Sequence, residues 1–532
     1  MALAGLALQE NYWDEFELGD EDIELLYSYL LEVEEPQTPQ QLALALVEAR
    51  LEREKRATQK LQNQGGSVYV PKDEHKPGDK LTFGSMNWQV GEVIETRPAM
   101  TFGNDTFRVI KVRFADDTTK EFASDLQNHA LNEPKEVAGD DPLLSPHAVV
   151  EKHGMALTQT LVKGLKNNDD FVYIAGRWFP RALLVDVNVG NLNLAEAILD
   201  MNGGGPLPTE DLLRQVDLSK SDNERLAGFS LDLALQDDLR FDEVGSTGKV
   251  LWFLKRLEPK EVQETPFTLR YQHVDYDRSS LNEQMLSLER KLDDELSEAD
   301  TGHATGEPLK EAEATLIYPH WRAGTLPITN RLKEFFPSAF ESPRILFTFI
   351  DDETGEEFSG WVVRLERYVF GLRDWYLKRG TMPGSIIRLR RAEEPGRLYI
   401  KADTHRSAKE WVRTALVGAD GGLVYATLKQ AVETAFDDRM MVYMPSAAEA
   451  LDQAWERRSK NPPSLEQVAT STLRELSKLN PQGHVHVAEL YSALNVVLRC
   501  PPGPLMALLA SRPWFSHVGD LHYRLDETRM GN

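Results

Sequence analysis

Residues 360 to 380 read "GWVVRLERYVFGLRDWYLKRG" and mix aromatic with basic side chains, in a chain of 532 residues whose formal net charge is −25. From residue 361 to 391 there are eight basic and two acidic residues, a local balance of +6, so the rest of the chain carries −31. A chain this acidic does not coat nucleic acid through its bulk charge. Any contact with nucleic acid is therefore expected to be local, and this stretch is the first candidate for it.

Short strands broken by proline and glycine are predicted around this stretch. "RILFTFIDDETGEEFSGWVVRLE" and "SIIRLRR" have strand character, and short helices are predicted in "NRLKEFF" and "GLRDWYLKR". Residues two apart on a strand share a face, so Arg388 and Arg390 are expected side by side. Arginines spaced in this way can contact successive phosphates or guanine edges. The region 314–403 is therefore predicted to be a β-rich domain with a basic surface.

Four landmarks in this region occur in a recognisable order. They are "LP" before a short helix ending in "FFP", a strand with "DDETGEEF" and "GW", a helix, and "PG" before another strand. In this order they resemble the B-three-type pseudobarrel of plant auxin-response and related transcription factors. The same fold occurs in effector domains of some restriction endonucleases. The resemblance implies that residues 314–403 form a pseudobarrel that binds double-stranded DNA.

The resemblance also implies which side chains hold DNA, because two arms of that family grip the major groove. By position, the first arm carries Arg322, Thr325, Thr329 and Asn330, and the second carries Trp361, Arg364, Arg367 and Tyr368. Arg388 and Arg390 complete the expected DNA-binding residues. Glu366 departs from the plant members, as does the scarcity of basic residues in the first arm, and both bear on base specificity. The alternative is that the aromatic residues form a core and the arginines a solvated face.

A repeated ending marks three other parts of the chain. "NNDDFVYIAGRWFPRALL" (167–184), "LQDDLRFDEVGSTGKVLWFLKRL" (235–257) and "SRPWFSHVGDLHYRLDE" (511–527) each contain a polar turn, an aromatic-led strand, a bend with glycine and a second strand. Helical periodicity precedes each one, which is the layout of a winged helix. "AFDDRMMVYMP" (435–445) is a weaker fourth copy. The second and last copies resemble the HARE-type winged helix of the bacterial RNA polymerase delta subunit; unrelated hairpins are the alternative.

The remaining segments complete a multidomain α+β chain. Residues 10–64 have helical spacing, compatible with a helix-turn-helix element or a plain helical hairpin. Residues 67–130 alternate as in an SH3-like barrel, with a hairpin turn predicted in "ADDTTKEF". Between 260 and 315 we expect a helix that packs on a neighbour and then a flexible segment, "TGHATGEPLKEAEA"; a solvated acidic tether is the alternative. The predicted order is N-terminal helices (10–64), SH3-like β-barrel (67–130), winged helix (140–186), HARE-like winged helix (187–258), helix and linker (259–313), pseudobarrel (314–403), winged-helix-like unit (404–460) and C-terminal winged helix (461–532).

No catalytic or cofactor site is expected. The glycines of "MNGGGP" lack the strand-to-helix context of a phosphate-binding loop, and "GHVHVAEL" places two histidines on one strand face without a third ligand. The aspartate pairs that precede the hairpins are interpreted as turn residues. The single cysteine, Cys500, excludes a disulfide within the chain and suits a reducing cytoplasm. No apolar run approaches 18 residues and the start is a poor signal peptide, so a cytoplasmic protein without a membrane partner is expected.

These observations predict a non-enzymatic protein that binds double-stranded DNA and is associated with transcription or the chromosome. RNA polymerase or other protein subunits are further expected partners, because the acidic balance of the winged-helix units favours protein contacts. Two alternatives stay open: the DNA-recognition subunit of a restriction or phage-defence system, and a protein-interaction scaffold that does not bind DNA.

Overall fold

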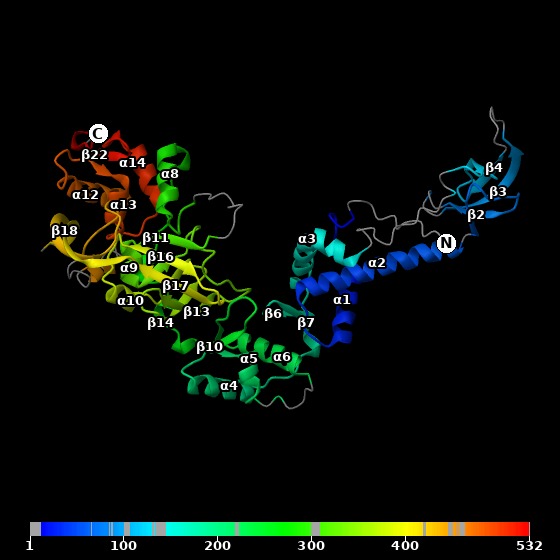
Figure 1. Ribbon diagram of the computed structural model, residues 1–532, viewed down its shortest axis with the longest axis horizontal. Coiled ribbons are helices and arrows are strands. Elements are labelled where there is room, and N and C mark those ends of the chain that lie inside the picture. Colours follow the sequence, from blue (N-terminus) through cyan, green and yellow to red (C-terminus); the bar gives the residue numbers. More distant parts are fainter. Residues whose placement is uncertain are drawn as a thin grey trace. The chain divides into compact units, whose positions relative to one another are not determined.

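The computed structural model (Figure 1) describes residues 12–530 except 65, 84–85, 87–88, 100–106, 130–131, 133–144, 217, 219–222, 299–308, 419–421, 445–450, 454 and 457–462. It divides into two compact units, Met1–Asp186 with Leu218–Ser230, and Val187–Asp217 with Leu231–Asn532. Helices and several separate sheets occur in both, as expected of a multidomain α+β chain. Within the part described, no helix is both long and apolar enough to cross a membrane.

Among the described residues up to Asp186, the first unit has three helices and a hairpin besides the five-stranded sheet described below. In chain order they are α1 (Asp20–Val33), α2 (Pro39–Gln64), α3 (Pro146–Lys166), β6 (Phe171–Ile174) and β7 (Arg177–Pro180). Gln37, between α1 and α2, exchanges backbone hydrogen bonds of 3.1 and 2.8 Å with Trp178 of β7. The segments 10–64 and 140–186, predicted as separate domains, therefore meet in one assembly. The contact spans 141 residues of sequence, so local periodicity could not indicate it.

A five-stranded sheet is inserted between α2 and α3. Its strands pair in chain order: β1 (Ser67–Val68), β2 (Lys80–Phe83), β3 (Gln89–Pro98), β4 (Arg108–Phe114) and β5 (Thr119–Ser124). The predicted turn in "ADDTTKEF" joins β4 to β5, with Asp117 in the left-handed region (φ 59°) and the Asp116 carboxylate accepting a hydrogen bond from the Thr118 amide. Alternating apolar residues, among them Phe83 and Ile110, form its core, as the two-residue period predicted.

Two later parts of the chain repeat the order of elements seen around α3. The first has α4 (Val189–Met201), β8 (Leu207–Pro208), α5 (Thr209–Leu213), α6 (Glu224–Asp237), β9 (Phe241–Glu243) and β10 (Leu251–Leu254). The second has α12 (Leu465–Ser477), β20 (Val485–His486), α13 (Val487–Asn495), α14 (Pro502–Ser511), β21 (Phe515–Gly519) and β22 (His522–Leu525). In both, the last strand lies between the other two. We call the three assemblies the first, second and third copies.

The copies match strand for strand. In the first copy Gln37 takes the place of the first strand, and β7 lies between it and β6. A short 3-10 helix follows the last strand each time, at Arg181–Leu183, Lys255–Leu257 and Glu527–Arg529. The shared hairpin endings seen in the sequence therefore reflect a shared order of helix, strand, helix, helix, strand, strand.

The seven-stranded sheet occupies the region of the predicted pseudobarrel. Its strands are β11 (Glu311–Thr315), β12 (Thr325–Pro327), β13 (Arg344–Asp351), β14 (Glu357–Val363), β15 (Tyr368–Phe370), β16 (Ile386–Arg391) and β17 (Arg397–Ala402). They follow the order β11-β16-β17-β13-β14-β15-β12, and the sheet curls around apolar side chains such as Phe347, Phe349 and Leu389. All its pairs are antiparallel except β13 with β17.

One of the two helices predicted here is confirmed. "GLRDWYLKR" contains α10 (Arg373–Lys378), but "NRLKEFF" forms turns, and the other helix, α9 (Tyr318–Ala323), lies earlier in the chain. Phe335 and Phe336 are both buried, although they are neighbours, and Pro337 follows at once. A regular helix could not continue past that proline, because it lacks an amide donor and clashes with the preceding turn.

Residues 404–460 do not form the helix-and-hairpin unit predicted for them. "LVYATLKQAVETA" lies in β19 (Leu423–Thr434), which pairs with β18 (Thr404–Val417) in a long antiparallel hairpin. Tyr425, Val432 and Thr434 are buried while their exposed neighbours alternate with them. The spacing of apolar residues in this segment was compatible with a helix. The segment is a strand because it pairs with β18 along its whole length.

Residues 259–313 contain the predicted helix. It is α8 (Glu283–Leu292), which buries Met285 and Leu288 in the core of the third copy. The helix therefore packs on a neighbour, as expected, and is not a solvated tether. Most of the predicted flexible segment, residues 299–308, lies outside the described residues.

A buried ionic cluster holds the second unit together. The Arg499 guanidinium, fully buried after α13, donates hydrogen bonds of 2.7 Å to both Asp294 and Glu295, which follow α8. Glu295 also lies 3.1 Å from the His320 ring in α9, and Tyr491 of α13 donates to Asp294. Arg499 lowers the pKa of the Glu295 carboxyl against the effect of its burial. The third copy, the segment after α8 and the seven-stranded sheet thus share one set of charges.

Removing Arg499 is expected to leave two buried carboxylates without their cation. Breaking a buried ion pair from one side costs about 3–5 kcal/mol. We therefore expect Arg499→Met to lower the stability of α13 and α14 by that amount, measured by hydrogen exchange of their peptides in a urea series. Lys478→Met, which removes an ion pair of 2.6 Å to Glu475 at the surface of the same copy, is the control and should cost less than about 1 kcal/mol. Equal effects would contradict the role assigned to Arg499.

A second prediction concerns pH. Asp232 of the second copy is buried and accepts hydrogen bonds from the Trp252 indole (2.8 Å) and the Thr209 hydroxyl, and its burial raises the pKa of the carboxyl to about 7. In the unfolded chain this pKa is about 3.9. Between these values the folded state binds the proton more tightly, so stability falls as pH rises from about 4 to about 7.

Asp232→Asn removes this titration and keeps the side-chain oxygen that accepts both hydrogen bonds. We expect the variant to gain stability relative to the parent chain as pH rises from 5 to 8, measured as the difference in urea midpoint for the second copy. Asp237→Asn, at the exposed end of the same helix, serves as the control. A difference between Asp232→Asn and the parent that stays constant with pH would contradict the prediction.

Candidate nucleic-acid interface

Two residues expected on the second DNA-binding arm lie inside the protein. Trp361 is 5% exposed and its ring meets Phe253 edge to face at a centroid distance of 5.3 Å. Tyr368 is 1% exposed and donates a hydrogen bond of 2.6 Å to the Glu261 carbonyl. Both pack in one cluster with Val244 of the second copy. This face of the seven-stranded sheet is therefore covered by the chain itself.

Charges reinforce the same contact. Arg344 of β13 forms ion pairs with Asp242 of β9 (2.5 Å) and Glu258 (3.6 Å), and it donates to the Val262 carbonyl. Burial, then the nearby Asp242, raises the pKa of Glu258 to about 8. The apolar cluster and the ion pair between Arg344 and Asp242 fix the second copy on the strands that carry Trp361 and Tyr368.

The first predicted arm is also engaged internally. Thr325 and Thr329 are buried; the Thr325 hydroxyl lies 2.9 Å from a His320 ring nitrogen, and the Thr329 hydroxyl donates to Asp293. Arg322 forms an ion pair with Asp452, and Asn330 is half-buried. The structure brings these residues close to the buried ionic cluster and does not present them together on a surface.

The predicted arginines divide into paired and unpaired residues. Arg388 forms ion pairs with Glu313 (2.8 Å) and Asp403 (3.1 Å), and Arg390 bonds Asp352 and lies over the Tyr399 ring. Other cations of the quoted stretch also meet carboxylates, for example Lys378 with Glu356 and Arg379 with Asp351. The local balance of +6 is thus largely offset by acids that lie outside residues 361–391.

Arg364 and Arg367 are the expected site residues that remain available. Arg364 is exposed and donates to the Ser342 carbonyl (2.8 Å), while Arg367 is half-buried with its backbone in the left-handed region (φ 57°). Neither has a carboxylate partner in the part of the chain that the structure describes. The turn between β14 and β15 therefore keeps two free cations, separated by the exposed Leu365 and Glu366.

A continuous basic stripe lies on α3, the third helix of the first copy. One face of α3 buries Val149, His153, Leu157, Leu161 and Leu165 at intervals of four residues. The opposite face exposes Lys152, Met155, Ala156, Gln159, Lys163 and Lys166. Residues at this spacing line one side of a helix. We call these six exposed residues the α3 stripe.

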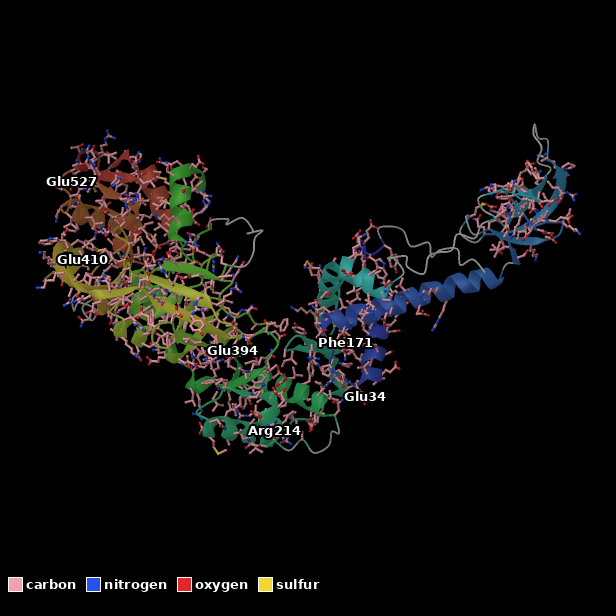
Figure 2. The ribbon with its side chains drawn as sticks, viewed as in Figure 1. Glu34, Phe171, Arg214, Glu394, Glu410 and Glu527 are labelled. Atoms are coloured by element: carbon pink, nitrogen blue, oxygen red, sulfur yellow. The ribbon has the colours of Figure 1, made fainter. Side chains whose placement is uncertain are left out.

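The α3 stripe is open and uniformly non-acidic. Met155 is 80% exposed, and none of the three lysines has an ion-pair partner among the described residues. The exposed Glu151 borders the stripe, because it lies one turn before Met155 and about 40° from it around the helix. From Lys152 to Lys166 the stripe runs for about 21 Å at 1.5 Å per residue. Figure 2 shows the side chains along α3 and labels Phe171, which begins the hairpin of the same copy.

The third helices of the other two copies differ from α3. The α6 sequence "ERLAGFSLDLALQD" has one basic and three acidic residues. The α14 sequence "PGPLMALLAS" has no charged residue, and seven of its ten residues are buried. Sequence reasoning compared the hairpin endings of the copies and missed the α3 stripe, although the helical spacing of its polar residues in "EKHGMALTQTLVKGLK" is visible in the sequence.

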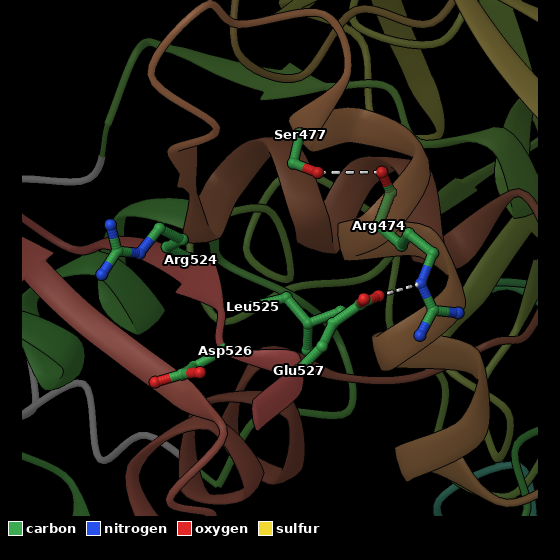
Figure 3. Close-up of a pocket in the computed structure, with 6 residues that line it drawn as sticks. All are labelled: Arg474, Ser477, Arg524, Leu525, Asp526 and Glu527. Atoms are coloured by element: carbon green, nitrogen blue, oxygen red, sulfur yellow. Dashed lines mark hydrogen bonds and ion pairs between the residues drawn. The ribbon is translucent and has the colours of Figure 1, made fainter. Parts of the chain in front are cut away.

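A shallow pocket lies at the surface of the third copy. It has a volume of about 420 Å³ and is lined by Arg474, Ser477, Arg524, Leu525, Asp526 and Glu527 (Figure 3). Arg474 forms an ion pair of 2.9 Å with Glu527, and the Ser477 hydroxyl bonds the Arg474 carbonyl. Two basic and two acidic side chains face the same space, so the lining selects for neither sign of charge.

The histidines and aspartates considered from the sequence have structural roles. The His486 ring accepts a hydrogen bond from the Ala488 amide (3.1 Å) and caps α13, and burial lowers its pKa to about 4. Asp238 and Asp437 accept backbone hydrogen bonds from residues two positions later, as turn residues do. Among the described residues no group of three ligand-type side chains could hold a metal ion.

In comparisons with known proteins, no family model, curated protein or solved structure matches this chain.

The position of Trp361 yields a testable expectation. Truncating a buried tryptophan costs about 3–5 kcal/mol, so Trp361→Ala should destabilise the contact between β14 and the second copy. Leu365→Ala, at an 83% exposed position four residues later, is the control and should change stability by less than about 0.5 kcal/mol. Urea unfolding and hydrogen exchange of β10 and β14 measure both. If Trp361→Ala left stability unchanged but removed DNA binding, the residue would belong to an interface with DNA.

Proposed function

We propose that this chain is a non-enzymatic protein that binds double-stranded DNA through α3. The observation that carries the proposal is the α3 stripe, with three lysines free of ion pairs on an exposed helix face. In a chain of net charge −25, such a surface is a local site for a polyanion. Lysines of this kind bind phosphates and release counterions, which is the main source of affinity for duplex DNA.

The order of elements supports the choice of helix. Helix, strand, helix, helix, strand, strand, with the last strand in the middle of the sheet, is the layout we interpret as a winged helix in all three copies. In helix-turn-helix proteins the later helix of the pair enters the major groove, which is wide enough to admit it. In the first copy that helix is α3. The five-stranded sheet, interpreted as SH3-like, is inserted in the sequence before α3.

The side chains of the α3 stripe are better suited to contact the phosphate backbone of DNA than to recognise particular bases. Three lysines can hold phosphates, while Gln159 can bond an adenine edge and Met155 can touch a thymine methyl group. With one amide and no arginine on the stripe, affinity should exceed sequence selectivity. We therefore place the chain among transcription- or chromosome-associated factors that bind many sequences.

The other two copies fit protein partners. The third helix of the second copy is acidic and that of the third copy is buried. A protein-interaction role beside the DNA-binding one is therefore our second proposal for them, with RNA polymerase or another basic subunit as the class of partner. We still interpret the seven-stranded sheet as a pseudobarrel, but propose a structural role for it, because the second copy covers Trp361 and Tyr368 of the expected arm.

Alanine at Lys152, Lys163 and Lys166 tests the proposal. Loss of three phosphate contacts should weaken binding to a mixed-sequence duplex at least tenfold and reduce the salt slope of log K by about 3, at about 0.9 per contact. Fluorescence anisotropy at several salt concentrations measures both. The matched control replaces Lys249, Lys260 and Lys333, which are exposed in the second unit, and should change little.

A further variant separates the two candidate surfaces. Arg364→Ala with Arg367→Ala should leave duplex binding nearly unchanged if α3 is the site. If that variant abolishes binding and the α3 variant does not, the DNA site lies on the seven-stranded sheet, as the family resemblance implied. If neither change affects binding, or the parent chain does not bind duplex, the protein is not the DNA-binding protein proposed. Circular dichroism melting checks that each variant is folded.

A further inference from the structure

Around its middle, the hairpin of β18 and β19 has one buried face and one open face; nearer the loop, Ala415 and Tyr425 are buried on the side of the open face as well. Val412 and Val432 lie on the buried face, where they pack with Met382 and Met441. Both ends of the hairpin are anchored: the Thr434 hydroxyl bonds Ser385 (2.9 Å) at one end, and the Tyr425 hydroxyl donates to the Ala493 carbonyl (2.8 Å) near the other. The hairpin is thus anchored near both ends, so the side chains exposed between the two anchors lie on a fixed surface.

The open face presents a tryptophan between two lysines. Trp411 is 65% exposed and lies directly opposite Lys429 in the register, with the ammonium 5.4 Å from the centre of its ring. Lys409, two residues earlier on the same strand, shares that face and is exposed. Glu410 (labelled in Figure 2) lies between them and alternates to the other face.

The exposed cations of this face differ from Arg413, which shares the face two residues after Trp411 but is largely buried and paired with Glu489 (3.5 Å). Neither Lys409 nor Lys429 has an ion-pair partner in the described part of the chain, and the same holds for the exposed Arg406 at the irregular start of the hairpin. One carboxylate, Glu433, also lies along this side of β19, where it approaches Gly380. Elsewhere in this unit most arginines of the seven-stranded sheet are paired with acids, so the hairpin stands out as a cationic surface.

The exposed indole needs an explanation of its own. Tryptophan is highly buried on average, and leaving such a ring in water forgoes the favourable burial of its apolar surface. Lysines alone would suit any anion, including an acidic peptide. A flat aromatic surface flanked by cations suits a ligand that is itself planar and negatively charged, because bases stack on the ring while phosphates meet the lysines.

We infer that the open face of the β18–β19 hairpin is a binding site for single-stranded nucleic acid. Trp411 stacks on an unpaired base, and Lys409 and Lys429 hold the adjacent phosphates. Two residues of a strand span about 7 Å, so Lys409 reaches phosphates next to the stacked base. The site is separate from the α3 stripe and does not rest on the proposed function.

The test uses the full chain and two labelled probes, a mixed-sequence single strand of about 20 nucleotides and the blunt duplex of the same sequence. Stacking on an aromatic side chain is worth about tenfold in affinity or more per base, so Trp411→Ala should weaken single-strand binding at least tenfold. Trp411→Phe should keep most of it, and Thr427→Ala, on the same face, should change nothing. Alanine at Lys409 and Lys429 should reduce the single-strand salt slope by about 1.4, at about 0.7 per phosphate.

The two sites are distinguished by testing each variant with both the single-stranded and the duplex probe. The α3 triple variant should lose duplex binding and keep single-strand binding, and Trp411→Ala should do the reverse. The inference is overturned if Trp411→Ala binds the single strand as tightly as the parent chain, or if Trp411→Phe loses as much as Trp411→Ala. It is also overturned if a glutamate polymer of equal charge displaces the labelled single strand as effectively as unlabelled single strand does. The surface would then bind any polyanion through charge alone.

Discussion

The buried charge of Arg499 is the constraint on which the second unit depends. A guanidinium without access to water is tolerated only when its partners are in place, because desolvation costs several kcal/mol per ion. Its carboxylate partners, Asp294 and Glu295, come from the segment after α8, and Glu295 in turn contacts His320 of α9. The third copy and the seven-stranded sheet therefore cannot separate without exposing or orphaning these charges, and we expect them to fold as one body.

This assembly decides which surfaces are left for ligands. Packing on α8 buries the third helix of the third copy, and docking of the second copy covers Trp361 and Tyr368. The arginines of β16 meet carboxylates from neighbouring segments. Among the described residues, the exposed cationic surfaces include the α3 stripe in the first unit and, in the second, the turn with Arg364 and the hairpin face around Trp411. None of these surfaces is covered by the packing contacts named above.

Local sequence patterns predicted local structure well but did not predict strand pairings or ion pairs between residues far apart in the sequence. The strand-bend-strand endings, α10 and the turn at Asp116 could be predicted because residues a few positions apart determine them. The pairing of Gln37 with Trp178, and of Arg388 with Glu313 75 residues away, depends on tertiary packing. For the same reason the basic stretch suggested a DNA-binding surface: its charge was visible in the sequence, whereas the acids that offset it and the second copy that covers it were not.

The three copies also show why the fold alone does not determine function here. They share one order of elements, yet the third helix is basic and exposed in the first, acidic in the second, and apolar and buried in the third. Packing restrains only the inward face of such a helix, so its outward face can diverge without cost to the core. In the first copy the outward face carries lysines, and a whole five-stranded sheet is inserted between α2 and α3. A long insertion in a connection adds little closure entropy, so the first copy can hold an extra domain and still present its helix.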